Sequence, residues 1–167
     1  MTHADTDYHR PGQRRIGALA LIRNTRGEVL LVNPSCKDGH ILVGGGALPD
    51  EEPQHAAYRE AVEETGLTQL HVGDLLLVDY IPANPTNGAV EGYNFVFDAG
   101  TISDDDAIVL PAGLPGQEPE LTSWVFCPPD QLDTYCLPYQ ARRITEALAA
   151  LAHPSRRGLR IEGMSAR

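Results

Sequence analysis

Residues 44–67 read GGGALPDEEPQHAAYREAVEETGL, and this acidic stretch is the most informative part of the sequence for fold and function. It contains no Lys and one Arg, whereas its carboxylates crowd together at Asp50, Glu51, Glu52, Glu60, Glu63 and Glu64. Like charges on one surface repel each other, so a segment selected for stability alone would intersperse positive charges. The stretch is therefore either the solvated face of a helix or a site that binds cations.

The second half of the stretch has the pattern of a helix. Pro53 fits the first turn, where its missing N–H would have no helical partner, and Gly66 is typical of a helix end. Apolar residues at helical spacing lie between them, at Ala56, Ala57, Ala61 and Val62. We therefore expect a helix over residues 53–65.

Three acidic residues of this expected helix, Glu60, Glu63 and Glu64, are spaced i, i+3 and i+4 and therefore share one face. Hard divalent ions take oxygen ligands, and Mg²⁺ commonly combines one or two carboxylates with phosphate oxygens of a substrate. The spacing suits Mg²⁺, with Mn²⁺ as the alternative, bound between these side chains and a phosphorylated ligand.

The loop before the helix supplies two further elements. Arg59 points about 100° away from Glu60 on a helix, and a pair between Arg59 and Glu51 would tie the loop to the helix. The glycines at 44–46 let the backbone approach closely and adopt positive φ. A carbonyl exposed there, for which we name Gly45, is a candidate metal ligand.

Apolar runs on both sides of the stretch indicate strands and a second helix. We expect a hairpin at 15–33, strands at 40–44, 70–81, 92–100 and 121–127, an irregular connection at 101–119, and an amphipathic helix at 137–153. Strands that surround two helices indicate an α+β domain arranged as an α/β/α sandwich.

Length and composition favour one domain. The chain has 167 residues, of which 42% are apolar, enough for a sizeable core. We divide the chain into a flexible N-terminal segment at 1–13, one domain at 14–153 and a polar, basic tail at 154–167. We expect this tail to be disordered or to pack on a neighbouring subunit.

The net charge of −10 argues against binding to nucleic acid polymers, which requires a basic surface. The sequence has no run of about 18 apolar residues, so we expect no membrane span. The N-terminus lacks the apolar core of a secretory signal, and a cytoplasmic location is the default expectation. Cys36, Cys127 and Cys136 are odd in number and lack zinc-type spacing, which favours reduced thiols.

The acidic stretch resembles the sequence signature of Nudix hydrolases, G-x5-E-x7-R-E-U-x-E-E-x-G-U, in which U is aliphatic. The defined positions fall on Gly45, Glu51, Arg59, Glu60, Ala61, Glu63, Glu64, Gly66 and Leu67, and every fixed identity is met. Leu48 and Asp50 stand where many relatives have Glu and Gly, which reshapes the loop without touching the chemistry.

The resemblance implies a mixed sheet between helices and a Mg²⁺-dependent hydrolase. Its substrate would be a nucleoside diphosphate linked to another moiety, and water would attack one phosphorus of the diphosphate. The resemblance makes Glu60, Glu63 and Glu64 the metal ligands. Either Glu60 or Glu64 would accept the proton from water, and Arg59 would orient the cluster through Glu51.

The resemblance leaves several points open. A further catalytic Glu can come from outside the signature, and the candidates are Glu91, Glu118 and Glu120. A non-catalytic sensor of a nucleotide-like ligand and a Nudix-fold isomerase of a prenyl diphosphate are alternative functions. The sensor would lack catalytic acids, and the isomerase would need an additional catalytic Cys and Glu. Many relatives form dimers, so a homodimer is the expectation that the resemblance carries.

Overall fold

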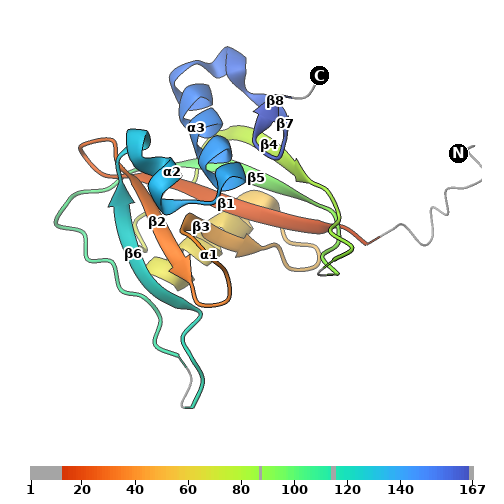
Figure 1. Cartoon of the computed structure of the whole chain (residues 1–167). Coiled ribbons are helices and arrows are strands. Elements are labelled where there is room, and N and C mark those ends of the chain that lie inside the picture. The colour runs from red at the N-terminus through yellow and green to blue at the C-terminus, as the bar shows by residue number, and fades with distance from the viewer. Residues whose placement is uncertain (1–12, 87, 114–115, 166–167) are drawn as a thin grey trace, which may run out of the picture.

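The apolar runs of the sequence form the strands of one mixed sheet. In the computed structural model, which describes residues 13–86, 88–113 and 116–165, the strands lie in the order β6-β2-β3-β1-β5-β4-β7-β8 (Figure 1). They are β1 (Arg15–Arg23), β2 (Val29–Pro34), β3 (Ile41–Gly46), β4 (Leu75–Ile81), β5 (Gly92–Thr101), β6 (Leu121–Cys127), β7 (Gly158–Ile161) and β8 (Met164–Ser165). The predicted flexible segment at 1–13 lies, apart from Gln13, outside the described residues.

The sheet combines parallel and antiparallel pairs. β1 runs parallel to β5, with Ile16 opposite Tyr93, and β4 runs parallel to β7. β3 pairs antiparallel with both β1 and β2, and β2 pairs antiparallel with β6.

Two longer helices cover the two faces of this sheet. In Figure 1, α3 (Pro138–Ala152) lies in front of the sheet and α1 (Pro53–Thr65) lies behind it. Among the described residues, the other helical segments are the single turns η2 (Pro129–Gln131), α2 (Leu132–Tyr135) and η3 (Pro154–Arg156). A mixed sheet between helices is the α+β, α/β/α arrangement that the sequence predicts, so the predicted fold class is confirmed.

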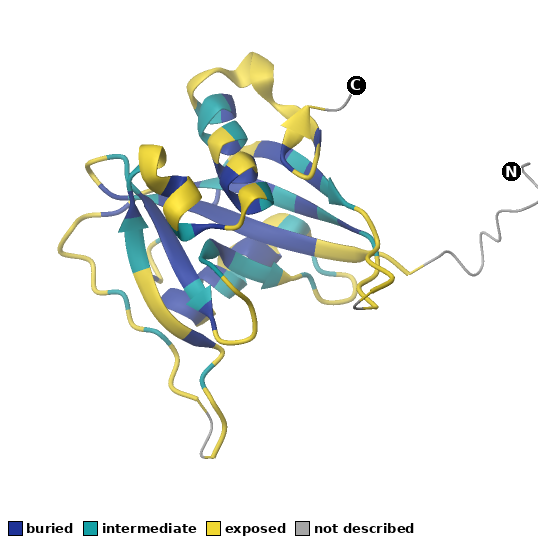
Figure 2. Cartoon of the chain, viewed as in Figure 1, coloured by how far each residue is buried: buried dark blue, intermediate teal, exposed yellow. Residues whose placement is uncertain are grey.

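Strand β1 is buried on both faces because helices cover both sides of the sheet. Ala18 and Ala20 belong to the core on the α1 side, whereas Leu19 and Leu21 belong to the core on the α3 side. Figure 2 accordingly shows most of β1 as buried. This explains why the strand is a continuous apolar run in the sequence instead of an alternating one.

The acidic helix α1 has the predicted bounds. Ala56, Ala57 and Ala61 are fully buried in the core against the sheet. Gly66 ends the helix in the left-handed conformation (φ 73°), and its N–H donates to the carbonyl of Val62. The small alanines let the helix axis come close to the sheet.

The predicted hairpin at 15–33 is only partly correct. Its turn forms, since the N–H of Gly27 donates to the carbonyl of Asn24, but β1 and β2 pair only at Arg23 and Val29. Beyond that point β3 lies between them. Gly44 permits this close approach, because it adopts φ 135° and a Cβ there would overlap the carbonyl oxygen of Ala18.

The predicted strand at 70–81 begins only at Leu75. The preceding residues make other contacts, because the side chain of Gln54 donates to the carbonyls of Val72 and Gly73. The N–H of Gly73 donates to the carbonyl of Asp98, which holds this segment at the end of the sheet.

The basic tail is part of the sheet, so the expectation that it is disordered or packs on a neighbouring subunit is wrong for residues 154–165. β7 pairs with the outer edge of β4, and β8 pairs with β7. The strand satisfies backbone groups of β4 that an open edge would leave unpaired. Arg160 of the tail is buried and donates to Glu146 at 2.9 Å.

A buried ion pair connects α3, β4 and the turn between β7 and β8. The carboxylate of Asp79 accepts hydrogen bonds from Arg143 Nε at 2.7 Å and from the N–H of Gly163 at 2.9 Å. Asp79 is fully buried and Arg143 is 3% exposed. Because both charges are out of water, each depends on the other for compensation.

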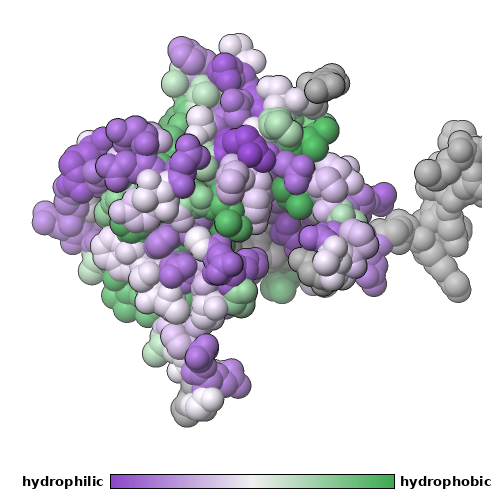
Figure 3. All heavy atoms as spheres, viewed as in Figure 1, coloured by the Kyte–Doolittle hydropathy of each residue, from purple (hydrophilic) through white to green (hydrophobic). Residues whose placement is uncertain are grey.

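In the part of the chain that the structure describes, no helix combines the length and apolar character that a membrane crossing requires. Hydrophilic residues are spread widely over the face shown in Figure 3, which agrees with the net charge of −10.

We expect Asp79→Ala to reduce the free energy of unfolding by about 3–5 kcal/mol, because Arg143 would remain buried without its counter-charge. Urea unfolding followed by circular dichroism measures this loss. The double variant Asp79→Leu/Arg143→Met should be more stable than Asp79→Ala, and Asp105→Ala at an exposed position should change stability by less than about 0.5 kcal/mol. A loss below about 1 kcal/mol for Asp79→Ala would contradict the assigned role of the pair.

Candidate active site

The carboxylate of Glu64 lies between α1 and the glycine strand β3. Glu64 is only 9% exposed, and its Oε2 accepts a hydrogen bond from the N–H of Gly44 at 2.8 Å. Burial raises the pKa of Glu64 to about 7, although the N–H of Gly44 opposes this shift. The nearby charges of Glu60, Glu120 and Glu63 contribute smaller parts of this same rise. Glu64 is therefore an acid whose charge the metal-free site disfavours.

Glu60 occupies space that only glycine leaves free. A Cβ on Gly45 would lie 2.5–2.6 Å from the carboxyl atoms of Glu60, whereas a Cβ on the neighbouring Gly46 would meet nothing within 4 Å. The carboxylate of Glu60 therefore rests against the backbone of β3 at Gly45. The structure brings this predicted metal ligand and this predicted glycine together.

Arg59 and Glu51 form the predicted link between loop and helix. Arg59 Nε and Nη2 donate to the two carboxylate oxygens of Glu51 at 2.8 and 2.9 Å. Glu51 also accepts a hydrogen bond from the N–H of Leu48 at 2.8 Å. The hydrogen bonds from Arg59 and Leu48 lower the pKa of Glu51 to about 2, and the bond to Glu51 raises the pKa of Arg59.

The guanidinium of Arg59 also contacts two other acids of the helix. Its Nη1 donates to Glu60 Oε1 at 2.9 Å and to Glu63 Oε2 at 3.0 Å. Its Nη2 donates to the carbonyl of Gly46 at 3.0 Å. Arg59 thus connects three of the four predicted acidic site residues, and Glu64 lies beside them against β3.

Among the three candidate acids outside the signature, Glu120 is the one whose charge reaches the site, since it raises the pKa of Glu64. Glu91 is held elsewhere, because it accepts hydrogen bonds from Tyr80 Oη at 2.6 Å and contacts Arg14 Nε at 2.6 Å. Glu118 is exposed in the connection between β5 and β6. Glu120 is therefore the best-placed of the three.

The donor set suits a hard divalent cation. Glu60, Glu63 and Glu64 offer carboxylate oxygens on one side of α1, and Gly45 leaves room beside them. Within the described residues, however, no three acidic, His or Cys side chains are already gathered as a metal site. Glu60 and Glu63 contact Arg59 instead, and the side chain of Glu63 is 58% exposed.

Apart from the carbonyl of Gly45, sequence reasoning named no backbone group of this site. The N–H groups of Gly44 and Leu48 and the carbonyl of Gly46 hold Glu64, Glu51 and Arg59 respectively. Every residue has these groups, so residue types carry no direct signal for them. The glycine run at 44–46 is the one hint that the backbone takes part.

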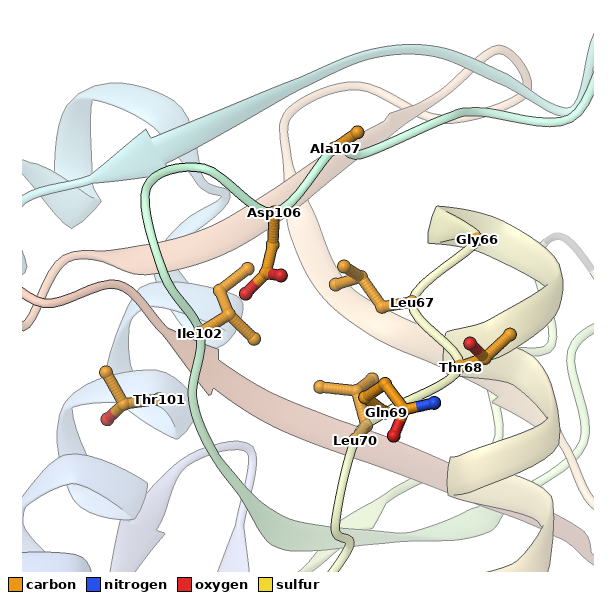
Figure 4. A pocket seen from close by; sticks show the side chains of 9 residues that line it. All are labelled: Gly66, Leu67, Thr68, Gln69, Leu70, Thr101, Ile102, Asp106 and Ala107. Atoms are coloured by element: carbon orange, nitrogen blue, oxygen red, sulfur yellow. The ribbon is translucent and has the colours of Figure 1, made fainter.

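A cavity of about 250 Å³ lies at the end of α1, and it does not include the predicted acids. Figure 4 shows its lining, which consists of Gly66, Leu67, Thr68, Gln69, Leu70, Thr101, Ile102, Asp106 and Ala107. Asp106 is its single carboxylate, and no cluster of acids faces it. We therefore place the candidate site at the face of α1 that carries Glu60 and Glu64, not in this cavity.

The fold and the site define a protein in which helix α1 presents clustered carboxylates next to the glycines of strand β3, within a mixed sheet. The sequence model of the NUDIX domain matches residues 13–148. Among solved structures, the MutT protein from Methanosarcina mazei Go1 is 27% identical, with a TM-score of 0.66 over 84% of this chain and 96% of that chain.

Two more distant structures share the fold. An Ap4A hydrolase from C. elegans is 18% identical, with a TM-score of 0.63 over 84% of this chain and 98% of that chain. The NUDIX domain of Shewanella oneidensis NrtR, complexed with ADP ribose, is 15% identical, with a TM-score of 0.66 over 91% of this chain and 99% of that chain.

The chain belongs to the Nudix hydrolase family. The predicted family and the predicted enzyme class, a Nudix hydrolase, are therefore confirmed. The individual roles of Glu51, Arg59, Glu60, Glu63 and Glu64 stay predictions.

The raised pKa of Glu64 predicts a pH-dependent stability of the metal-free protein. The unfolded carboxyl titrates near 4.5 and the folded one near 7, so the stability that Glu64 contributes is complete below pH 4.5 and is lost as pH rises through 7. The loss is on the order of 3 kcal/mol. We expect Glu64→Gln in EDTA to gain stability relative to the wild type between pH 5 and pH 8, as measured by urea unfolding.

Glu118→Gln is the control for this measurement, because Glu118 is exposed and its substitution should leave the pH dependence unchanged. If the difference between wild type and Glu64→Gln is the same at both pH values, Glu64 does not titrate as described.

Proposed function

We propose that this chain is a Mg²⁺-dependent hydrolase that cleaves the diphosphate linkage of a nucleoside diphosphate joined to another moiety. One observation carries the proposal, namely the buried carboxylate of Glu64 held at Gly44 beside the carboxylate of Glu60. Carboxylates held this close together repel each other, and a bound cation would offset that repulsion. The ligand names of the similar structures, Ap4A and ADP ribose, support a nucleotide-derived substrate.

Glu60, Glu63 and Glu64, with the carbonyl of Gly45, would hold the ion, which is Mg²⁺ or alternatively Mn²⁺. When bound, such an ion neutralises phosphate oxygens and lowers the pKa of a coordinated water. The remaining contribution comes from the side chains and backbone of this chain.

Two tasks fall to the side chains of this chain, namely accepting a proton and positioning the loop. Glu64 accepts the proton of the attacking water, since the N–H of Gly44 fixes its carboxylate beside Glu60, at the place proposed for the ion. Glu60 is the alternative acceptor within the helix, and Glu120 is the one outside it. Arg59 is a positioning residue, because its two-pronged bond to Glu51 fixes the loop before α1 against the helix.

The two alternative functions gain no support. A sensor would dispense with catalytic acids, yet Glu60, Glu63 and Glu64 are all present. An isomerase would need a reactive Cys, but burial raises the pKa of Cys136 to about 12 and also raises that of Cys127. Cys36 is exposed. The cytoplasmic location and a homodimeric state stay predictions.

A substrate panel in H₂¹⁸O tests the proposal. With Mg²⁺, we expect hydrolysis of at least one nucleoside diphosphate derivative, with one ¹⁸O incorporated into a phosphate product, as seen by mass spectrometry. Glu63→Gln and Glu64→Gln should each lower kcat by at least about 100-fold, since each loses a ligand or base. Glu162→Gln, at an exposed position between β7 and β8, is the matched control. Saturable binding without turnover across the panel would favour the sensor.

The two adjacent glycines of β3 give a second test. Gly45→Ala should lower kcat/KM by at least about tenfold, because the new methyl group displaces the carboxylate of Glu60. Gly46→Ala should stay within about twofold of wild type, because its methyl group enters open space. Equal effects of the two substitutions, with both proteins folded by circular dichroism, would contradict the position assigned to Glu60.

A further inference from the structure

The two ends of the Arg59 guanidinium have different partners. Nε and Nη2 donate to both oxygens of Glu51 at 2.8 and 2.9 Å, so this end makes a two-pronged contact. The other end, Nη1, makes one bond to Glu60 at 2.9 Å and one to Glu63 at 3.0 Å. One positive charge is therefore shared among three carboxylates.

The acids held by Nη1 are the ones that the proposed function assigns to the metal. Glu60 and Glu63 lie one helical turn apart, where two unpaired carboxylates would repel each other. The described residues contain no gathered set of three metal-ligating side chains. The cation that Glu60 and Glu63 share in this structure is Arg59 itself.

We propose that Nη1 of Arg59 is the resident cation of Glu60 and Glu63 in the metal-free protein, and that a divalent ion competes with it for these carboxylates while the pair with Glu51 persists. This inference rests on the proposed function, which makes Glu60 and Glu63 metal ligands.

The geometry explains why one end of Arg59 is released and the other is kept. Glu51 receives a two-pronged contact and a third hydrogen bond from the N–H of Leu48, and its side chain is only 16% exposed. Glu63 has a single bond to Arg59, and its side chain is 58% exposed. Two-pronged charged contacts are the stronger kind, so an incoming ion displaces the single bonds first.

Competition of this kind has two consequences. Without metal, Arg59 offsets the repulsion between the acids and keeps the helix face assembled. With metal, the guanidinium stays nearby through Glu51, and its positive charge opposes the ion. Removing Arg59 should therefore weaken the metal-free fold and strengthen ion binding, which are opposite effects of one substitution.

Calorimetric titration with Mn²⁺ alone, at one pH and one ionic strength, tests the proposal. We expect Arg59→Met to bind Mn²⁺ about tenfold more tightly than the wild type, because two charged hydrogen bonds no longer compete. Its melting temperature should fall in EDTA and recover with saturating Mn²⁺. Unchanged or weaker Mn²⁺ binding by Arg59→Met would overturn the proposal.

Arg26→Met is the matched control, because Arg26 likewise joins two carboxylates, those of Glu28 and Asp104, away from the site. It should leave Mn²⁺ affinity unchanged. If it tightens binding as much as Arg59→Met does, the effect is one of net charge and the proposal fails.

A measurement on the wild type covers the case in which Arg59→Met does not fold. In ¹⁵N and ¹³C NMR spectra with saturating Mg²⁺, the Nε–H signal of Arg59 should keep its position, while the carboxyl carbon signals of Glu60 and Glu63 should move. If the Nε–H signal moves as far as the carboxyl signals, or if neither moves, the two ends of Arg59 do not act separately and the proposal is wrong.

Glu60→Gln and Glu63→Gln separate this inference from the proposed function. If both variants bind Mn²⁺ like the wild type, the metal assignment itself fails, and the proposed function fails with it. If both bind at least about tenfold more weakly while Arg59→Met shows no gain, only the competition by Arg59 is excluded.

Discussion

The hydrogen bond from the N–H of Gly44 to Glu64 joins the acidic helix to the sheet, and the rest of the candidate site is arranged around this contact. A carboxylate in this position loses most of its hydration, and one backbone donor offsets only part of that loss. The site exists because the helix packs with alanines and the strand offers glycines, so the two backbones come close. Bulkier residues on either surface would separate the helix from the strand and leave the acids in solvent.

The distribution of charge follows from this packing. Glu51, Glu60 and Glu63 share a single guanidinium, and Glu64 lies beside them, so the site is rich in acids within a chain whose net charge is already −10. A polyanionic substrate would be repelled from such a surface unless cations accompany it. The acids therefore explain the affinity for divalent ions that we propose. They also explain why a diphosphate would bind here only together with such ions.

Features that depend on local residue types could be predicted from the sequence. The predictions were wrong where segments distant in the sequence pair with each other. The bounds of α1 follow from Pro53 and Gly66, and the pairing of Arg59 with Glu51 follows from their charges and spacing. The insertion of β3 between β1 and β2 does not, because a hairpin is the simplest local solution and only tertiary packing excludes it. The tail was misjudged for a similar reason, since its strand β7 forms only by pairing with β4, and its Arg160 is buried only where it meets Glu146 of α3. Glu120 could not be singled out, because the loop that carries it has no periodic pattern.

The central position of β1 has a consequence for how the chain acquires its structure. β1 forms its parallel pair with β5, whose residues lie far along the chain, as the register of Ile16 with Tyr93 shows. Contacts between such distant segments must overcome the entropy of closing a long loop, and folds rich in them fold slowly. Until β5 arrives, β1 has an unpaired apolar edge, and such an edge is prone to associate with other chains during synthesis.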